Sequence, residues 1–177
     1  MKPLQGSHEG LPTGLVIRKA NKEDLPGLEW KGEYIHYRRL FAQAYQEAES
    51  GNAVLWICEL PIRGIIGQAF VQLLSQNLEL ADGCLKAYVH GVRVMAEYRN
   101  LGIGTLLMNT VEKDLLRRGY TEIILNVTRD NHGALRLYQR RGFRIIGADA
   151  GEWSYIDHRG IRCFVKEPAW RMKKNLY

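Results

Sequence analysis

The sequence has few cysteines, and their arrangement excludes two classes of small protein. Cys58, Cys84 and Cys163 are far apart, odd in number and outside any spacing typical of metal ligands. A disulfide framework needs paired cysteines, and a zinc site needs closely spaced ligands. We therefore expect free thiols, no bound metal and a reducing compartment, the cytoplasm.

Long hydrophobic runs are also lacking. Residues 1–14, MKPLQGSHEGLPTG, have no apolar centre of the kind that a signal peptide needs, and no later segment is long enough to cross a bilayer. We interpret residues 1–14 as a flexible tail and residues 15–177 as a single domain without a membrane partner. The 46% hydrophobic composition is sufficient for a real core.

The excess of positive charge, +6 with a pI near 9.3, is not gathered in one place. Lysines and arginines often lie beside acidic residues, as in NKED (21–24) and VEKDLLRR (111–118). This pattern is typical of a solvated surface rather than of a nucleic-acid-binding stripe, so no nucleic-acid partner is expected. A positive balance would equally suit a polyanionic nucleotide cofactor.

Strand and helix patterns alternate along the chain without internal repeats. Hydrophobic periodicity and turn residues predict helices over 21–28, 32–51, 104–118 and 131–142. Strands are expected over 14–20, 52–60, 65–74, 85–94 and 121–127, with two final strands from 142–148 and 160–176. This order predicts an α/β (α+β) fold with a mixed, largely antiparallel sheet and helices on its faces.

Two glycines lie between an expected strand and a leucine-rich helix, in the segment RNLGIGT (99–105). The start of a helix presents unpaired N–H groups, and glycines let phosphate oxygens approach them, so a pyrophosphate would fit here. The dinucleotide fingerprint is excluded because Leu107 stands where its third glycine is needed, and the Gly-Lys ending of a P-loop is absent. A simple tight turn would also explain an isolated pair of glycines.

Two sequence blocks resemble the GNAT superfamily of acetyl-CoA-dependent N-acetyltransferases. The first is the family signature of Arg or Gln, two residues, Gly, one residue, and Gly or Ala, which residues 99–104 match in full. The second block comprises Asn131, Ala134, Leu135, Leu137, Tyr138, Arg140, Gly142 and Phe143. The resemblance is strongest over residues 88–143. Ala96 departs from it, because many relatives have proline before the acidic-aromatic pair.

The resemblance implies a twisted sheet with helices on both faces and two central strands that splay apart to form the acetyl-CoA groove. The pantetheine arm would pair with the backbone of Val92 to Val94, where an N–H would also stabilise the oxyanion of the reaction. The pyrophosphate would lie on the glycine loop, Asn131 would bind the cofactor arm, and Arg140 or Arg141 would meet a phosphate or remain a solvated charge. The residues assigned to acetyl-CoA are Val92, Arg93, Val94, Arg99, Asn100, Leu101, Gly102, Ile103, Gly104, Thr105, Asn131, Tyr138 and Arg140.

The implied reaction moves an acetyl group to a primary amine by direct attack in a ternary complex. The departing thiolate must be protonated or otherwise stabilised. Asn131, Ala134, Leu135 and Tyr138 form one helical stripe, so Tyr138 is the candidate general acid. The alternative is a core tyrosine whose hydroxyl is satisfied within the protein.

The amine must also lose a proton, because an amine with a pKa near 10.4 is mostly charged at neutral pH. His90 is the leading candidate base. Strand alternation predicts that Tyr88, His90, Val92 and Val94 share one face, and the position of His90 is similar to a catalytic histidine in the arylalkylamine N-acetyltransferase branch. The alternatives are a hydrogen-bonded core histidine, or Glu29 or Glu33 as the base.

The acceptor is left open by the sequence. The segment LEWKGEYIHYRRLF (28–41) lies where this family usually builds its acceptor wall, and Glu29, Trp30, Tyr34 and Tyr37 are the candidate acceptor-binding residues. Aromatic residues would suit a hydrophobic or cationic amine, whereas arginines would suit an acid such as an amino acid. The acceptor is thus a small-molecule or peptide amine. An acetyl-CoA-binding module without transferase activity is the alternative function, and a homodimer follows only from the habits of the family.

Overall fold

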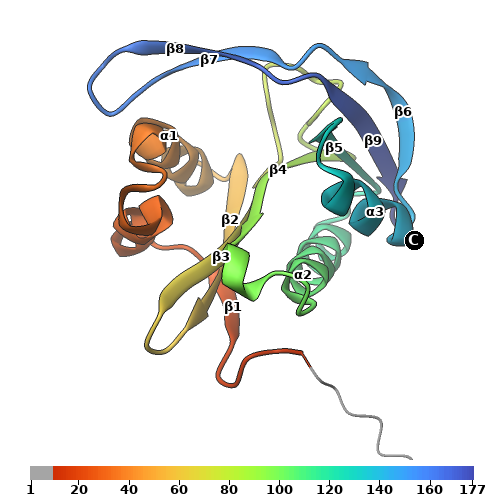
Figure 1. Cartoon of the computed structure of the whole chain (residues 1–177). Coiled ribbons are helices and arrows are strands. Elements are labelled where there is room, and N and C mark those ends of the chain that lie inside the picture. The colour runs from red at the N-terminus through yellow and green to blue at the C-terminus, as the bar shows by residue number, and fades with distance from the viewer. Residues whose placement is uncertain (1–9) are drawn as a thin grey trace, which may run out of the picture.

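The computed structural model of the protein describes residues 10–177 (Figure 1). The expected tail, residues 1–14, lies mostly outside this range. The strands are β1 Val16–Lys19, β2 Ala53–Leu60, β3 Gly64–Gln72, β4 Lys86–Val94, β5 Glu122–Thr128, β6 Arg144–Asp149, β7 Glu152–Ile156, β8 Arg162–Lys166 and β9 Ala169–Asn175. The helices are α1 Arg38–Glu49, α2 Ile103–Arg117 and α3 His132–Arg140, with 3₁₀ turns η1 Lys22–Gly32, η2 Ile35–Tyr37 and η3 Ala96–Tyr98.

Seven strands form one sheet in the order β1-β2-β3-β4-β5-β9-β6. Neighbours in this sheet run antiparallel except β4 and β5, which are parallel. The expected mixed, largely antiparallel sheet is therefore confirmed. β2 and β3, two of the expected strands, form a hairpin around the turn at residues 61–63.

Helices cover both faces of the sheet (Figure 1). The α1 side buries a small cluster that includes Phe41 and Phe70. The α2 side buries a larger cluster, which includes Ile103, Leu107 and Val111, spaced four residues apart on α2. Because the helix period places these α2 residues on one face, the sequence pattern was sufficient to predict which side of α2 packs on the sheet.

Two local features differ from the sequence-based prediction. The helix expected over 32–51 begins only at Arg38, because Gly32 has a φ of 98° and residues 35–37 form the 3₁₀ turn η2 instead. A separate hairpin of β7 and β8 was not predicted as such, since residues 142–176 were expected to supply two strands. The turn residues DHRG (157–160) between two alternating stretches were its available signal.

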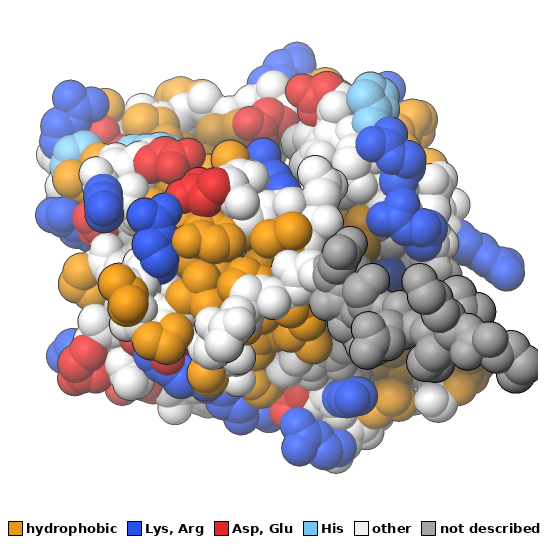
Figure 2. Space-filling view, turned by 60° about the horizontal axis from the view of Figure 1, so that its bottom comes forward, with side chains coloured by type: hydrophobic (Ala, Val, Ile, Leu, Met, Phe, Trp, Pro, Cys, Tyr) orange, Lys and Arg blue, Asp and Glu red, His pale blue; other side chains and the backbone are white. Residues whose placement is uncertain are grey.

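Basic side chains lie around the edges of the face shown in Figure 2, among acidic ones, and hydrophobic side chains gather at its centre. This distribution agrees with the scattered charges read from the sequence. Within residues 10–177, no helix has the length and apolar character needed to cross a membrane.

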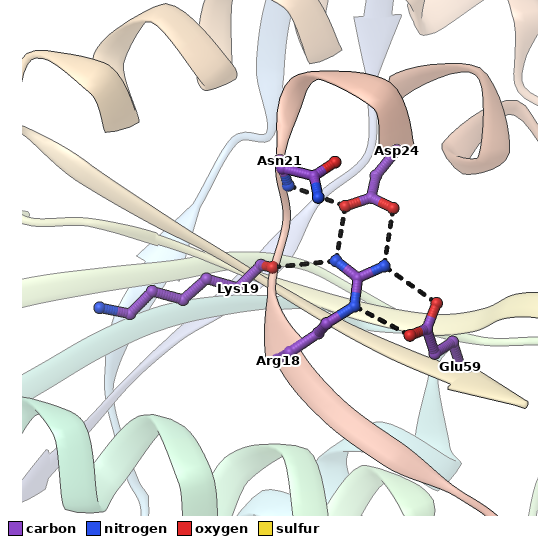
Figure 3. A network of polar contacts seen from close by, with 5 residues as sticks. All are labelled: Arg18, Lys19, Asn21, Asp24 and Glu59. Carbon is purple, nitrogen blue, oxygen red and sulfur yellow. Dashed lines mark hydrogen bonds and ion pairs between the residues drawn. The ribbon is translucent and has the colours of Figure 1, made fainter.

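A polar network fixes η1 to the edge of the sheet (Figure 3). The Arg18 guanidinium donates two hydrogen bonds to Asp24, at 2.7 and 2.8 Å, and two to Glu59, at 2.8 and 3.0 Å. The backbone N–H of Asn21, the residue before η1, also donates to Asp24 at 2.7 Å. The network therefore joins β1, β2 and the start of η1.

Replacing Asp24 with Asn should lower the free energy of unfolding by about 1–2 kcal/mol at pH 7. The hydrogen bonds from Arg18 hold the pKa of the Asp24 carboxyl below its ordinary value. The unfolded chain therefore takes up this proton at a higher pH than the folded chain, and the stabilisation is lost as the pH falls below about 3.9. Urea unfolding at pH 6 and pH 3 should show the difference between wild type and Asp24→Asn shrinking at the lower pH. An equal difference at both values would contradict the assignment.

Candidate active site

The glycine loop between η3 and α2 presents free backbone donors. Gly102 has a φ of 85°, and a Cβ added there would meet open space. The N–H groups from Asn100 to Thr105 donate to no acceptor within residues 10–177. The Arg99 Nε donates to the Val94 carbonyl at 2.9 Å and so fixes the loop to the end of β4. A row of unpaired donors at a helix start is suited to a phosphate group.

Gly104 also lies against α3. A Cβ at this position would lie 3.3 Å from the Leu137 Cδ2 of α3. The absence of a side chain therefore lets α2 and α3 pack closely. This contact brings the second sequence block beside the first.

Strands β4 and β5 separate at one end. Their pairing runs from Lys86 with Glu122 to Val89 with Leu125, whereas both strands continue further, to Val94 and Thr128. The splay that the family resemblance implied is therefore present. The sheet is therefore open between the last residues of β4 and the last residues of β5.

A β-bulge changes the direction of the side chains on β4. Phe70 pairs with His90 and Gln68 pairs with Arg93, so Ala69 alone faces two β4 residues, and Gly91 has a φ of 60°. The prediction that Tyr88, His90, Val92 and Val94 share one face is therefore wrong. Val92 and Val94 pack against the core on the α2 side, whereas Arg93 joins Tyr88 and His90 on the other side.

A cavity of about 690 Å³ lies on that other side, between α1, the sheet and the segment around β7. Aromatic rings form much of its wall, and the described residues that line it include four carboxylates and one guanidinium. The aromatic residues are Tyr34, Tyr37, Phe41, Phe70, Tyr88 and Trp153. The charged residues are Glu47, Asp149, Glu152, Glu167 and Arg93.

His90 lies in the wall of this cavity with its ring held by two aromatic neighbours. Its centroid is 5.5 Å from that of Tyr88, with the rings stacked, and 5.9 Å from that of Phe70, edge to face. Desolvation lowers the pKa of His90 to about 4. The imidazole is therefore neutral at neutral pH, able to accept a proton, and a weaker base than a histidine of ordinary pKa.

Tyr138 lies on α3 with its ring buried against Phe143, at 5.6 Å between centroids. Burial raises the pKa of Tyr138 to about 12. Asn131 begins this helix, and its Oδ1 accepts a hydrogen bond from the Ala134 N–H at 3.1 Å. The cap occupies Oδ1, so the Nδ2 of Asn131 is the group that could meet a ligand.

Of the residues predicted to bind the acceptor, two line the cavity and two lie outside its lining. Tyr34 and Tyr37 line the cavity, whereas Glu29 accepts a 2.6 Å hydrogen bond from Arg38 and is not part of the lining. Trp30 is buried behind Tyr34, edge to face at 5.3 Å.

Glu33, the other carboxylate considered as a base, is exposed outside the cavity lining. Arg141 donates to Glu112 at 2.9 Å and to Asn109 at 2.7 Å, which ties α3 to α2. Arg140 is exposed, so of these two arginines it is the one available to a phosphate.

The far wall of the cavity was missed in the sequence. It consists of Asn126 and Thr128 from β5, Asp149 at the end of β6, Trp153 on β7 and Glu167 after β8. These residues come from segments that meet only through the pairing of β5, β9 and β6. Among residues 10–177 there is no group of His, Cys, Asp or Glu arranged to hold a metal ion, and the three cysteines are free thiols.

Comparison with known proteins gives partial matches to two curated relatives. The chain is 35% identical over 65 residues to the "Probable N-acetyltransferase san" of Drosophila melanogaster, which covers 34% of each protein. It is 36% identical over 59 residues to the "N-alpha-acetyltransferase 30" of Schizosaccharomyces pombe, covering 33% of the chain and 39% of that relative. The chain therefore matches between a third and two fifths of the length of these relatives.

Solved structures resemble the whole described fold. The ribosomal-protein-S18-alanine N-acetyltransferase from Escherichia coli superposes with a TM-score of 0.68 at 19% identity, covering 92% of this chain and 94% of that one. Arabidopsis thaliana NAA60 in complex with acetyl-CoA gives 0.66 at 22% identity, covering 92% and 98%. Residues 24–143 match the family described as "Acetyltransferase (GNAT) family". The chain belongs to this acetyltransferase family.

Proposed function

We propose that the protein is an N-acetyltransferase that moves the acetyl group of acetyl-CoA to a primary amine by direct attack in a ternary complex. One observation carries this proposal: the splay between β4 and β5 lies between a loop of free amides and an aromatic cavity. One side therefore suits a phosphate-bearing donor and the other an acceptor. Membership of the GNAT family supports the same reading.

The donor side would be held mainly by backbone groups. The amides of Asn100 to Thr105 would bind the pyrophosphate, with Arg99 holding their loop in place. The backbone of Val92, Arg93 and Val94, which is free of β5, would pair with the pantetheine arm. Asn131 and Arg140 would reach the arm and a phosphate. Bound acetyl-CoA supplies an activated acetyl thioester.

Two side chains would move the protons. His90, neutral in the cavity wall, would take the proton of the acceptor amine, directly or through a water. Tyr138 would donate its hydroxyl hydrogen toward the leaving sulfur from α3. Its raised pKa keeps this hydroxyl protonated at neutral pH.

The cavity charges suit an amine acceptor. Four carboxylates against one guanidinium attract a protonated amine from solution, although Asp149 and Glu152 have Arg171 and Lys166 as ion-pair partners. Tyr34 and Tyr37 would contact the acceptor, and Glu29 and Trp30 would support this wall from behind. The acceptor is thus a small-molecule or peptide amine.

We further propose that residues 15–177 act as one domain in the cytoplasm, for which the free thiols are the support. A homodimer rests on the family resemblance alone. The competing function is a module that binds acetyl-CoA without transferring its acetyl group. Thiol release with a panel of amines separates the two, since a module would release none.

Excess acetyl-CoA should raise the melting temperature of the protein, and free adenosine should not. A ligand at about a hundred times its dissociation constant stabilises the folded state by roughly 2.7 kcal/mol. Gly102→Ala should reduce this stabilisation, because its Cβ would enter the open space beside the loop that a bound phosphate would occupy. Gly119→Ala is the matched control, since Gly119 follows the other end of α2, has a φ of 87° and also faces open space.

Both substitutions should cost similar stability without ligand, because both force alanine into the left-handed region. Only Gly102→Ala should weaken the response to acetyl-CoA. A full response in both variants would exclude the loop as the pyrophosphate site, and no response in the wild type would count against the whole proposal.

A further inference from the structure

Arg93 has an unusual position for a charged residue near the middle of a sheet. The bulge at Gly91 turns its side chain into the acceptor cavity, where it is the one guanidinium among the described lining residues. Without the extra residue, strand alternation would direct Arg93 toward the apolar core on the α2 side. The backbone irregularity therefore delivers a cation to the cavity.

The guanidinium is held in one orientation. Its Nη2 donates to the Gln68 Oε1 at 3.0 Å, and the Gln68 Nε2 donates to the Gly91 carbonyl at 3.0 Å. Gln68 is only 1% exposed. The guanidinium carbon lies 3.6 Å from the centre of the Tyr34 ring and 5.5 Å from that of Phe41. Hydrogen bonds and stacking thus fix Arg93 before any ligand binds.

One buried nitrogen of the Arg93 guanidinium lacks a hydrogen-bond partner within residues 10–177. The Nη1 of Arg93 is buried and makes no hydrogen bond to any described residue. Burial also lowers the pKa of the guanidinium from its ordinary value. No carboxylate of the described residues forms an ion pair with this guanidinium, which lines the cavity, so an oxygen atom of a bound ligand is its natural partner.

The acceptor is the better source of that oxygen than the donor. Val92 and Val94, on either side of Arg93, direct their side chains to the α2 side, whereas the Arg93 side chain lies in the cavity. His90 and Arg93 pair with Phe70 and Gln68, which are two positions apart on β3. Their backbones are therefore about 7 Å apart on one face.

We propose that the guanidinium of Arg93 donates a hydrogen bond to a carbonyl or carboxylate oxygen next to the reacting amine of the acceptor. The acceptor is then an α-amino acid unit, either free or at the N-terminus of a peptide. Its amine would face His90 while its oxygen faces Arg93. This inference rests on the proposed transferase function and makes Arg93 a specificity-determining residue.

The test compares three forms of each acceptor at saturating acetyl-CoA. For alanine, leucine, phenylalanine and lysine side chains, the free amino acid, its amide and the matching amine without the carbonyl group are assayed by thiol release. The wild type should favour at least one oxygen-bearing form over the amine by roughly 10- to 100-fold in kcat/KM. That ratio corresponds to the loss of a hydrogen bond from a charged donor. Preference for the acid indicates a free amino acid, and preference for the amide indicates a peptide terminus.

Arg93→Met should lower this ratio by roughly 10-fold or more, and Arg93→Lys should restore only part of it, because lysine keeps the charge without the planar fork. Arg39→Met, at an exposed position on α1, is the control and should keep the wild-type ratio. Equal use of all forms by the wild type would overturn the proposal. So would a ratio unchanged in both Arg93 variants, or a loss confined to the KM for acetyl-CoA. No turnover of any amine despite acetyl-CoA binding would instead contradict the transferase function.

Discussion

Tyr138→Phe is expected to lower kcat by roughly 10²-fold or more, with little change in the KM for acetyl-CoA. Proton donation by a positioned side chain typically contributes 10²–10⁴-fold to the rate. The substitution removes only the hydroxyl, while the ring remains packed against Phe143 in the core. Steady-state kinetics with saturating acceptor measure the effect, and the melting temperature with and without acetyl-CoA shows whether donor binding is retained.

Tyr120→Phe is the matched control. Tyr120 belongs to the same core cluster as Tyr138, and its hydroxyl is 3.5 Å from the Leu73 carbonyl, so removing it changes the core without touching the proposed donor site. This variant should retain a kcat close to that of the wild type. If Tyr138→Phe also keeps the wild-type rate, Tyr138 is a structural tyrosine and not the acid.

The raised pKa of Tyr138 adds a pH criterion. With a pKa of about 12, its hydroxyl stays protonated throughout the usual assay range. Deprotonation of Tyr138 should therefore cause no loss of rate below about pH 10. Tyr138→Phe should lower the pH profile between pH 6 and 9 without changing its shape.

The parts of the molecule that the sequence predicts well depend on local signals. The apolar row of α2 repeats with the helix period, the hairpin of β2 and β3 has apolar runs on both sides of a turn, and residues 99–104 carry a whole motif within six positions. Each of these signals lies within a single element or junction. The glycine loop and the elements on either side of it could therefore be predicted from the sequence.

The aromatic cavity depends on geometry that is not local. The bulge at Gly91 reverses the facing of Val92, Arg93 and Val94, and one glycine in a strand does not specify where an extra residue will be accommodated. Asp149, Trp153 and Glu167 reach the cavity through strand order and through a hairpin that packs outside the main sheet. The pKa of His90 depends on the aromatic rings around it, which come from different strands.

His90→Gln is expected to lower kcat/KM by roughly 10²-fold at pH 7, because glutamine can hydrogen-bond the amine but cannot take its proton. Desolvation lowers the pKa of His90 to about 4, so the imidazole becomes charged only when the pH falls toward 4. The His90-dependent acidic limb of kcat/KM should therefore have its midpoint near pH 4 rather than near 6.5. Between pH 5 and 7 the wild-type profile should show no loss from this group.

The pH profiles of wild type and variant, measured with short assays at each pH, separate a base from a packing residue. If His90→Gln loses the limb near pH 4 and has a lower rate at pH 7, His90 is the base. If the variant keeps the same limb, another group titrates there. His36→Gln is the control, since His36 packs on Tyr37 at 4.1 Å but does not line the cavity, and it should keep both the rate and the limb. If the wild-type limb lies near 6.5 and disappears in His90→Gln, then His90 is the base but water in the cavity restores its ordinary pKa, because solvation of the charged imidazole offsets the burial that lowers it.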